Sequence, residues 1–246
     1  MIDILFTSFL FATVLVGIHS YFGIYIIERG IIFTDLAIGQ MAAVGTALSI
    51  LLFGGKFFYP ISLLFSLIGA LLIALTSNKK NLSHEAFIGL IYATGISLSI
   101  ILLSKNPHGI EEVQRLQAAD ILFITKIDLI KTSILYSIIG LIIYFVVERI
   151  KGLKREILFF TLFAVTVTSS VNLAGVLIVF AILVVPAYVT GFFVKKFSLR
   201  LITSWIFGIF VNIISILISY FLDLPTGYTI VAFYSLLAII ISIFLK

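Results

Sequence analysis

Residues 29–45 read RGIIFTDLAIGQMAAVG and open an apolar stretch that continues to about residue 54. Asp35 is the only carboxylate in this stretch, and small residues follow it at helical spacing. An ionisable group at membrane depth costs several kcal/mol, so it usually faces a protein interior or a water-filled path and often marks an ion route. The stretch therefore predicts a transmembrane helix of the kind found in transporters.

The composition is that of a polytopic all-α membrane protein. Of the 246 residues, 62% are hydrophobic and 11% are charged, and the mean hydropathy is +1.29. Soluble domains have about 45–50% apolar and 25% charged residues. Because apolar runs cover nearly the whole chain, we expect a single transmembrane domain over residues 1–246, without a soluble catalytic domain.

The chain lacks a phosphate-binding loop pattern and lacks cysteine, which limits the reactions and metal ligands available to it. Gly54-Gly55-Lys56 is followed by Phe57, so the phosphate-binding pattern that ends in Lys-Ser/Thr is missing and any ATPase must be another polypeptide. The chain has no cysteine, which leaves oxygen and nitrogen as the strong metal ligands. The net charge of +5 lies in short loops, where it reports topology rather than nucleic-acid binding.

The apolar runs predict about nine spans, with eight equally defensible. They lie near residues 3–27, 31–54, 57–76, 86–104, 129–147, 157–172, 174–191, 201–221 and 227–245. The first run has no basic n-region and no A-x-A-like cleavage site, and it is longer than the apolar region of a signal peptide, so we expect a retained helix. The count is open between 157 and 191, where Asn172 and Gly175 interrupt one long run that is either two short helices or one bent helix.

Basic loops predict the orientation of the spans. They should lie in the cytoplasm and place the N-terminus outside and Glu28 at the inner surface. Their residues are Lys79, Lys80, Arg149, Lys151, Lys154, Arg155, Lys195, Lys196 and Arg200. Residues 105–128 would then be extracellular, and 110–121 suit a helix on the membrane surface, either a connector or a docking surface for an external partner.

One face of the second predicted helix carries the candidate substrate path. At intervals of i, i+4, i+7, i+8 and i+11 it presents Asp35, Gly39, Ala42, Ala43 and Thr46. Small residues on such a face either pack against another helix or leave room for a substrate. Gln40 is a further candidate for the path, although it lies about 140° around the helix from Asp35. For Asp35 itself, the alternative is a carboxylate that snorkels to the interface or caps the helix start.

Two further polar residues are candidates on other helices. His19 lies in the first span at a depth that overlaps the turn of Asp35, so it either ligates a metal or hydrogen-bonds a neighbouring helix. Asn172 lies beside a predicted helix break and could offer a carbonyl oxygen to a cation. The hydroxyls of Thr168, Ser169 and Ser170 need no functional role, because such groups commonly bond the carbonyl one turn earlier.

The order of four segments resembles the permeases of the zinc, manganese and iron importer family of ATP-binding-cassette transporters. These segments are residues 29–45, EAFIGLIY at 85–92, LAGVLIVFAILVVPA at 173–187 and LDLPTG at 222–227. The resemblance implies a prokaryotic multi-pass permease in the cell membrane that forms a homodimer or pairs with another permease, with two cytoplasmic ATPase subunits and an external metal-binding protein. It implies no stably bound cofactor, since the divalent metal passes through.

The resemblance also assigns site residues and shows one departure. The family motif G-D-x-x-S-H-A pairs an acid with a histidine, but here Thr34 replaces the glycine and Gly39 the histidine, which leaves Asp35 and His19 as candidate ligands. The family's ATPase-contacting short helix would fall within residues 186–197, which include Pro186, Ala187, Lys195 and Lys196. The same segment also suits a basic loop on anionic lipid.

Other functions fit the residues less well. A permease for a chelated metal or a cobalamin-like cofactor would accommodate the missing histidine. A proton-coupled secondary transporter would use Asp35 as a titrating group. An intramembrane metalloprotease needs H-E-x-x-H, but His84-Glu85 is followed by Ile88 at the second histidine position. We therefore expect no enzyme activity from this chain alone.

Overall fold

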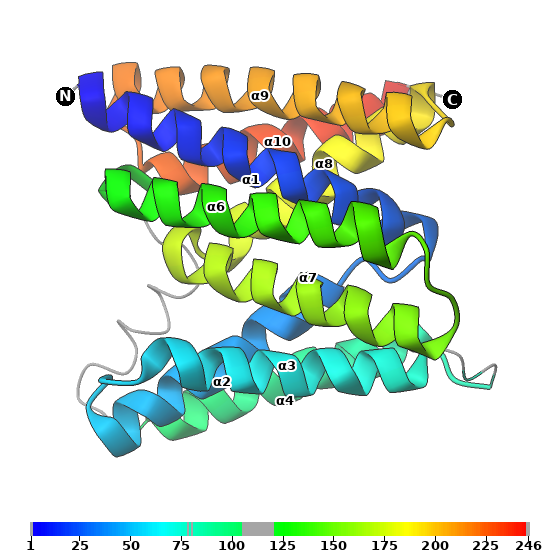
Figure 1. The fold of residues 1–246 in the computed structure, drawn as a ribbon. Helices are drawn as coiled ribbons and strands as arrows, with labels where there is room; N and C mark the ends of the chain where they lie inside the picture. The colour runs from blue at the N-terminus through cyan, green and yellow to red at the C-terminus, as the bar shows by residue number, and fades with distance from the viewer. Residues whose placement is uncertain (1, 78, 80, 105–120, 245–246) are drawn as a thin grey trace. The chain divides into compact units, whose positions relative to one another are not determined.

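The computed structural model describes residues 2–77, 79, 81–104 and 121–244 (Figure 1). The helices are α1 (Ile2–Glu28), α2 (Thr34–Phe53), α3 (Phe58–Thr76), α4 (His84–Leu103), α6 (Lys126–Ile142), α7 (Leu153–Ala174), α8 (Val176–Phe193), α9 (Phe197–Leu222) and α10 (Thr226–Phe244). A 3₁₀ turn, η1 (Ile121–Phe123), precedes α6, and a π-helical turn, η2 (Ile143–Val147), follows it. The expected surface helix at 110–121 falls almost entirely outside the described residues.

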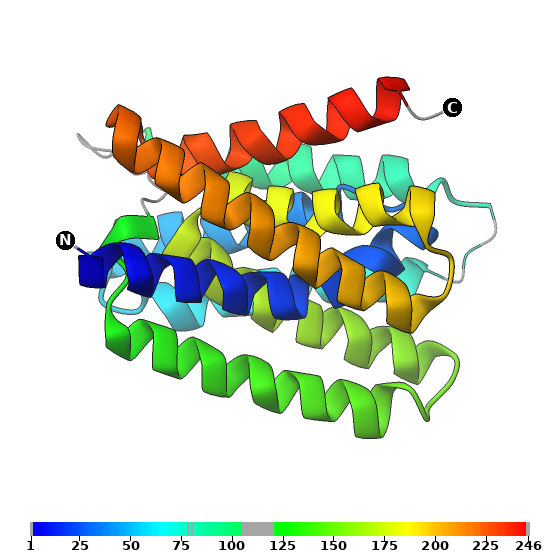
Figure 2. The same cartoon turned by 90° about the horizontal axis from the view of Figure 1, so that it is seen from above.

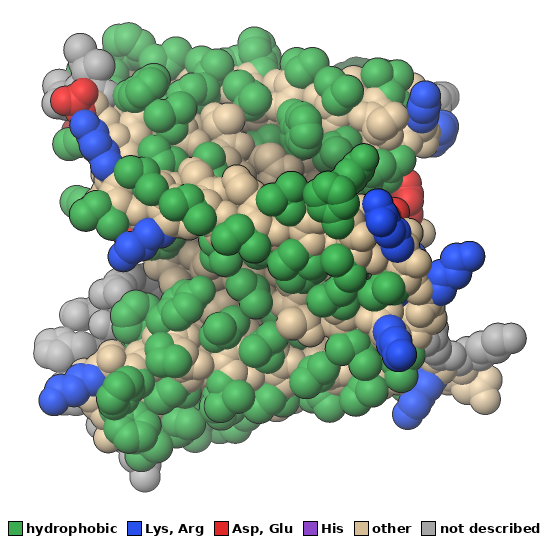
Figure 3. All heavy atoms as spheres, viewed as in Figure 1, with side chains coloured by type: hydrophobic (Ala, Val, Ile, Leu, Met, Phe, Trp, Pro, Cys, Tyr) green, Lys and Arg blue, Asp and Glu red, His purple; other side chains and the backbone are tan. Residues whose placement is uncertain are grey.

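Within the described part of the chain, nine helical segments of 18 to 26 residues are long and apolar enough to cross a membrane, with α6 and η2 forming one segment. Hydrophobic side chains cover the visible helices, while Lys and Arg gather at helix ends (Figure 3). This pattern matches an apolar slab of about 30 Å between two polar surfaces. The prediction of an all-α polytopic protein is confirmed, and nine spans are favoured over eight.

Gly175 separates α7 from α8, so the interrupted run forms two helices. Its backbone angles are φ 86° and ψ 158°, a region that is essentially restricted to glycine. Gly175 therefore ends the helical hydrogen-bond ladder of α7, and a new helix begins at the next residue.

The described residues group into two compact units, each built from segments distant in sequence. The first unit comprises Met1–Gly30, Ala118–Ser137 and Leu173–Lys246, and the second comprises Ile31–Gln117 and Ile138–Asn172. The chain passes from one unit to the other several times, so neither unit is a continuous segment. The single domain over residues 1–246 stays a prediction.

In the first unit, α9 lies along α1 with α10 beside it (Figure 2). Glycines permit this close approach. The Cα of Gly23 on α1 faces the backbone carbonyl of Leu183 on α8, and a Cβ at Gly208 would be 2.7 Å from a methyl group of Val16. The Trp205 Nε1–H also donates to the Gly17 carbonyl at 3.0 Å. Small residues and backbone carbonyls thus hold these helices together, as is usual in membranes.

In the second unit, α2 packs between α3 and α4. A Cβ at Gly69 of α3 would be 2.9 Å from the Met41 side chain, and one at Gly95 of α4 would be 2.8 Å from the Gln40 Cβ. Two faces of α2 are therefore committed to helix packing, and they fix how α2 is rotated.

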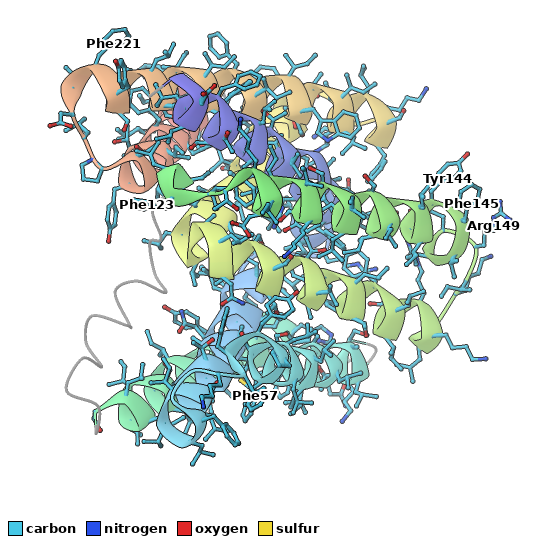
Figure 4. The ribbon with its side chains drawn as sticks, turned by 60° about the vertical axis from the view of Figure 1, so that its left-hand side comes forward. Phe57, Phe123, Tyr144, Phe145, Arg149 and Phe221 are labelled. Carbon is cyan, nitrogen blue, oxygen red and sulfur yellow. The ribbon has the colours of Figure 1, made fainter. Side chains whose placement is uncertain are left out.

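The end of α6 places aromatic residues at the expected membrane surface. In η2, the Glu148 N–H bonds the Ile143 carbonyl at 3.2 Å, which widens the last turn. Tyr144 and Phe145 are 69% and 52% exposed, and the Arg149 guanidinium carbon lies 5.9 Å from the Phe145 ring centroid (Figure 4). Exposed aromatic rings beside a cation are typical of a membrane–water interface.

Candidate metal-transport path

Asp35 lies in the first turn of α2, and its side chain is 2% exposed. Thr34 beside it is also buried, and its hydroxyl donates to the Ile31 carbonyl at 2.6 Å. Among the described residues, no group donates to the buried Asp35 Oδ1. The burial contradicts the alternative of a snorkelling carboxylate. The carboxylate does accept from the backbone N–H groups of Asp35 and Leu36 in the first turn of α2, as the helix-start alternative predicts, although the N-cap residue itself is Phe33. An acceptor oxygen without a donor is costly inside a protein, and a cation would satisfy it.

The small residues after Asp35 are buried along α2. At Ala42 the small-residue face packs against another helix, because the Ala42 carbonyl accepts from the Ser62 hydroxyl of α3 at 3.0 Å. The same carbonyl accepts from the Thr46 hydroxyl within α2 at 3.2 Å. Gly39 is buried one turn after Asp35, and its place on a substrate path stays a prediction.

Gln40 is 6% exposed, and its Cβ lies against Gly95 of α4. Its position agrees with the prediction that it lies well around the helix from Asp35. Gly95 provides the room that the Gln40 side chain requires, and this packing role was not predicted from the sequence. A role for Gln40 on the path stays a prediction.

His19 of α1 is fully buried, and its Nδ1 lies 2.9 Å from the Leu15 carbonyl oxygen. Because a carbonyl only accepts, Nδ1 must carry the proton and Nε2 is the acceptor nitrogen of the neutral ring. The ring also meets Tyr136 edge-on, with 6.1 Å between centroids. This tautomer is the one a metal ligand needs at Nε2, and the ligand role of His19 stays a prediction.

Near the end of α7, two serine hydroxyls bond a backbone carbonyl one turn earlier, as the sequence predicts. Ser169 and Ser170 both bond the Thr166 carbonyl, at 2.9 and 2.8 Å. Thr168 differs, because its hydroxyl donates to Ser66 of α3 at 2.6 Å and ties two helices together. The Asn172 Nδ2 is buried without a partner among the described residues. Its role toward a cation stays a prediction.

No separate short helix lies within residues 186–197, and the contact of this segment with an ATPase stays a prediction. Instead, α8 continues through Pro186 and Ala187 to Phe193, and α9 begins at Phe197 after a three-residue link. Pro186 is tolerated inside α8, and its carbonyl accepts from Thr190 at 2.7 Å and from Ser204 of α9 at 3.3 Å. Pro186 and Ala187 are buried, whereas Phe192, Phe193, Lys195 and Lys196 are exposed. Of these six residues, only the four exposed ones can contact a partner directly.

The charge pattern places Arg200 in a basic loop, whereas the structure places it in the first turn of α9 with its side chain 8% exposed. It bonds the Ala187 carbonyl through Nη2 at 2.7 Å and through Nε at 3.2 Å. It also pairs with Glu28 at 3.0 Å. The sequence carries no signal for this pair, because 172 positions separate its two residues.

Metal-ligating side chains are sparse in this fold. The described residues contain no group of three or more His, Cys, Asp or Glu side chains placed to hold a metal ion. A site for a passing ion needs fewer protein ligands and can draw on backbone and water oxygens.

The ABC 3 transport family model matches residues 1–245. The chain belongs to this family. It is accordingly a permease of an ATP-binding-cassette importer and a multi-pass prokaryotic membrane protein, as the resemblance predicted. Family membership also excludes the proton-coupled secondary transporter as the class of this ABC-3 permease.

Similar proteins extend along nearly the whole permease. A "Probable iron transport system membrane protein" of Haemophilus influenzae is 25% identical over 98% of this chain and 90% of its own length. The "Manganese transport system membrane protein MntC" of Listeria monocytogenes is 26% identical over 89% of this chain and 82% of its own. The structure of PsaBC from Streptococcus pneumoniae in complex with Fab has a TM-score of 0.77 at 20% identity and covers 96% of this chain and 89% of that one. This last likeness concerns the fold.

Proposed function

We propose that this ABC-3 permease carries a divalent metal ion, zinc, manganese or ferrous iron, with Asp35 as a ligand along the path. The observation that carries the proposal is the buried Asp35 carboxylate, whose Oδ1 has no donor among the described residues. A divalent cation would supply the partner that this oxygen lacks, and carboxylates are ligands for all three metals. The names of the iron and manganese relatives support the same substrate class.

The proposed transport cycle needs further polypeptides. Two cytoplasmic ATPases would close on ATP and move the exposed end of α8, while an external metal-binding protein would deliver the ion to a permease homodimer. The exposed Phe192 and Phe193, beside Lys195 and Lys196, suit insertion into a groove of an ATPase. The permease would move the ion without catalysing a reaction itself.

The proposal is tested by uptake into liposomes that contain the permease with its ATPase, each metal being offered on the external binding protein. Parent protein should take up at least one metal in an ATP-dependent manner. Asp35→Asn should abolish this uptake while the complex still co-purifies. The matched control is Asp3→Asn, an exposed acid at the start of α1, which should transport like the parent. Full uptake by Asp35→Asn would refute the ligand role.

A chelated metal is the second candidate, and one observation favours it. Gly39 stands where the related permeases are expected to carry a histidine, so the two-point site one turn apart is missing. In the same assay, uptake of a metal–chelate complex without uptake of any bare ion would identify this substrate class.

A further inference from the structure

Three helices of the first unit meet around one buried cation. Arg200 at the start of α9 reaches the Ala187 carbonyl of α8 with two nitrogens and the Glu28 carboxylate at the end of α1 with a third. Gly191 makes room for it, because a Cβ there would be 2.6 Å from Arg200 Nη2. One side chain therefore joins the last residue of α1, Ala187 within α8 and the first turn of α9.

The geometry of this junction depends on arginine. A guanidinium is planar and presents several donors in fixed directions, so it can hold a carbonyl and a carboxylate at the same time. A lysine is a single compact charge on a flexible stem and does not fix two partners in this way. Glu28 is 48% exposed, so water screens the ion pair. The two bonds to the buried Ala187 carbonyl thus set the position of the guanidinium.

A second contact ties the same turn of α9 to α1. The Phe197 ring lies 5.6 Å from the Tyr21 ring and 5.3 Å from the Tyr25 ring, measured between centroids. Phe197 directly follows the three-residue link that joins α8 to α9. The link is therefore anchored to α1 on its far side by both Phe197 and Arg200.

We propose that Arg200 is a positioning residue that makes the end of α1 move together with the turn between α8 and α9. This inference rests on the proposed coupling of that turn to an ATPase. A push on Phe192, Phe193, Lys195 and Lys196 then displaces Glu28, the last residue of α1. The chain reaches Asp35 seven residues after Glu28. The junction thereby connects the segment proposed to face the ATPase to the short loop between α1 and α2, the helix that carries Asp35.

The first test measures metal uptake per ATP hydrolysed in liposomes, with the metal that the parent complex transports. The test variants are Arg200→Gln, which removes the guanidinium, and Gly191→Ala, which displaces it and keeps its charge. Complexes of both variants should still hydrolyse ATP, while metal uptake per ATP should fall at least about fivefold. The matched control is Lys154→Gln, an exposed cytoplasmic cation at the start of α7, which should keep the parent ratio. A parent ratio in both test variants overturns the proposal.

The second test does not depend on which substrate is transported. Because the chain has no cysteine, Arg29→Cys with Ser198→Cys introduces two unique labelling sites, one just beyond α1 and one in the first turn of α9. Spin-label distances are measured in the complex without nucleotide and with a non-hydrolysable ATP analogue. The distance should be the same in both states, and should differ between them once Arg200→Gln or Gly191→Ala is added. A distance that changes with nucleotide in the otherwise unmodified junction overturns the proposal, even where the metal-importer function holds.

Discussion

Gly45 of α2 lies against the backbone of Ser62 in α3, where a Cβ at position 45 would be 2.6 Å from the Ser62 Cα. This close approach lets the Ser62 hydroxyl reach the Ala42 carbonyl at 3.0 Å. The contact fixes α2 against α3, and α2 is the helix whose first turn carries Asp35. Packing at Gly45 therefore helps to fix the position of α2, and with it the position of Asp35.

Gly45→Ala should destabilise the permease, because the added methyl group meets backbone atoms that cannot turn away. Overpacking of this kind costs about 1–3 kcal/mol. Gly89→Ala in α4 is the matched control, since nothing lies within 4 Å of a Cβ there and alanine favours the helix. Thermal unfolding midpoints in detergent should fall for Gly45→Ala and stay level or rise for Gly89→Ala. Equal midpoints for the two variants would contradict the contact.

Gly175→Ala should also be harmful, for a reason of backbone conformation. A residue with a Cβ at φ 86° and ψ 158° is strained by about 1–3 kcal/mol. The variant should lower the yield of folded permease and its unfolding midpoint, measured by size-exclusion chromatography of heated samples. Gly140→Ala in α6 is the control, because the space around its Cβ is open. A normal midpoint for Gly175→Ala would show that α7 and α8 can join without a glycine.

Variants of His19 should separate its two ring nitrogens. The amide of His19→Asn can replace the Nδ1–H that donates to the Leu15 carbonyl but supplies nothing at Nε2. If Nε2 ligates the metal, apparent metal affinity in this variant should fall by at least the roughly 10–100-fold that loss of an outer-shell partner of a ligand typically costs, with the unfolding midpoint nearly unchanged. The measurement is uptake as a function of metal concentration. His19→Gln is measured alongside, because its longer side chain carries the amide further from the backbone than that of His19→Asn. Unchanged affinity in His19→Asn would leave His19 as a helix-packing residue.

Charge reversal at the exposed link should weaken assembly with the ATPase. Lys195 and Lys196 are exposed between α8 and α9, and Lys195→Glu with Lys196→Glu changes the local charge by four units without touching a buried group. Co-purification of the ATPase with the permease should drop several-fold. The single reversal Lys154→Glu, at the start of α7, should leave co-purification at the parent level. Equal recovery in the two proteins would instead favour a link that lies on anionic lipid.

The sequence by itself determined the class of this protein, because long apolar runs have few folds available inside a bilayer and every backbone group must bond within its own helix. The cost of an ionisable side chain at membrane depth made Asp35 conspicuous, and a glycine inside a long apolar run marked Gly175 as an interruption. Tertiary structure alone decided which helices share a unit, that α8 runs through Pro186 without a separate short helix, and that Arg200 lies buried against Glu28 and Ala187. These contacts join residues far apart in the chain, and a local pattern reports a residue's own helix but not which distant carbonyl or carboxylate will satisfy it.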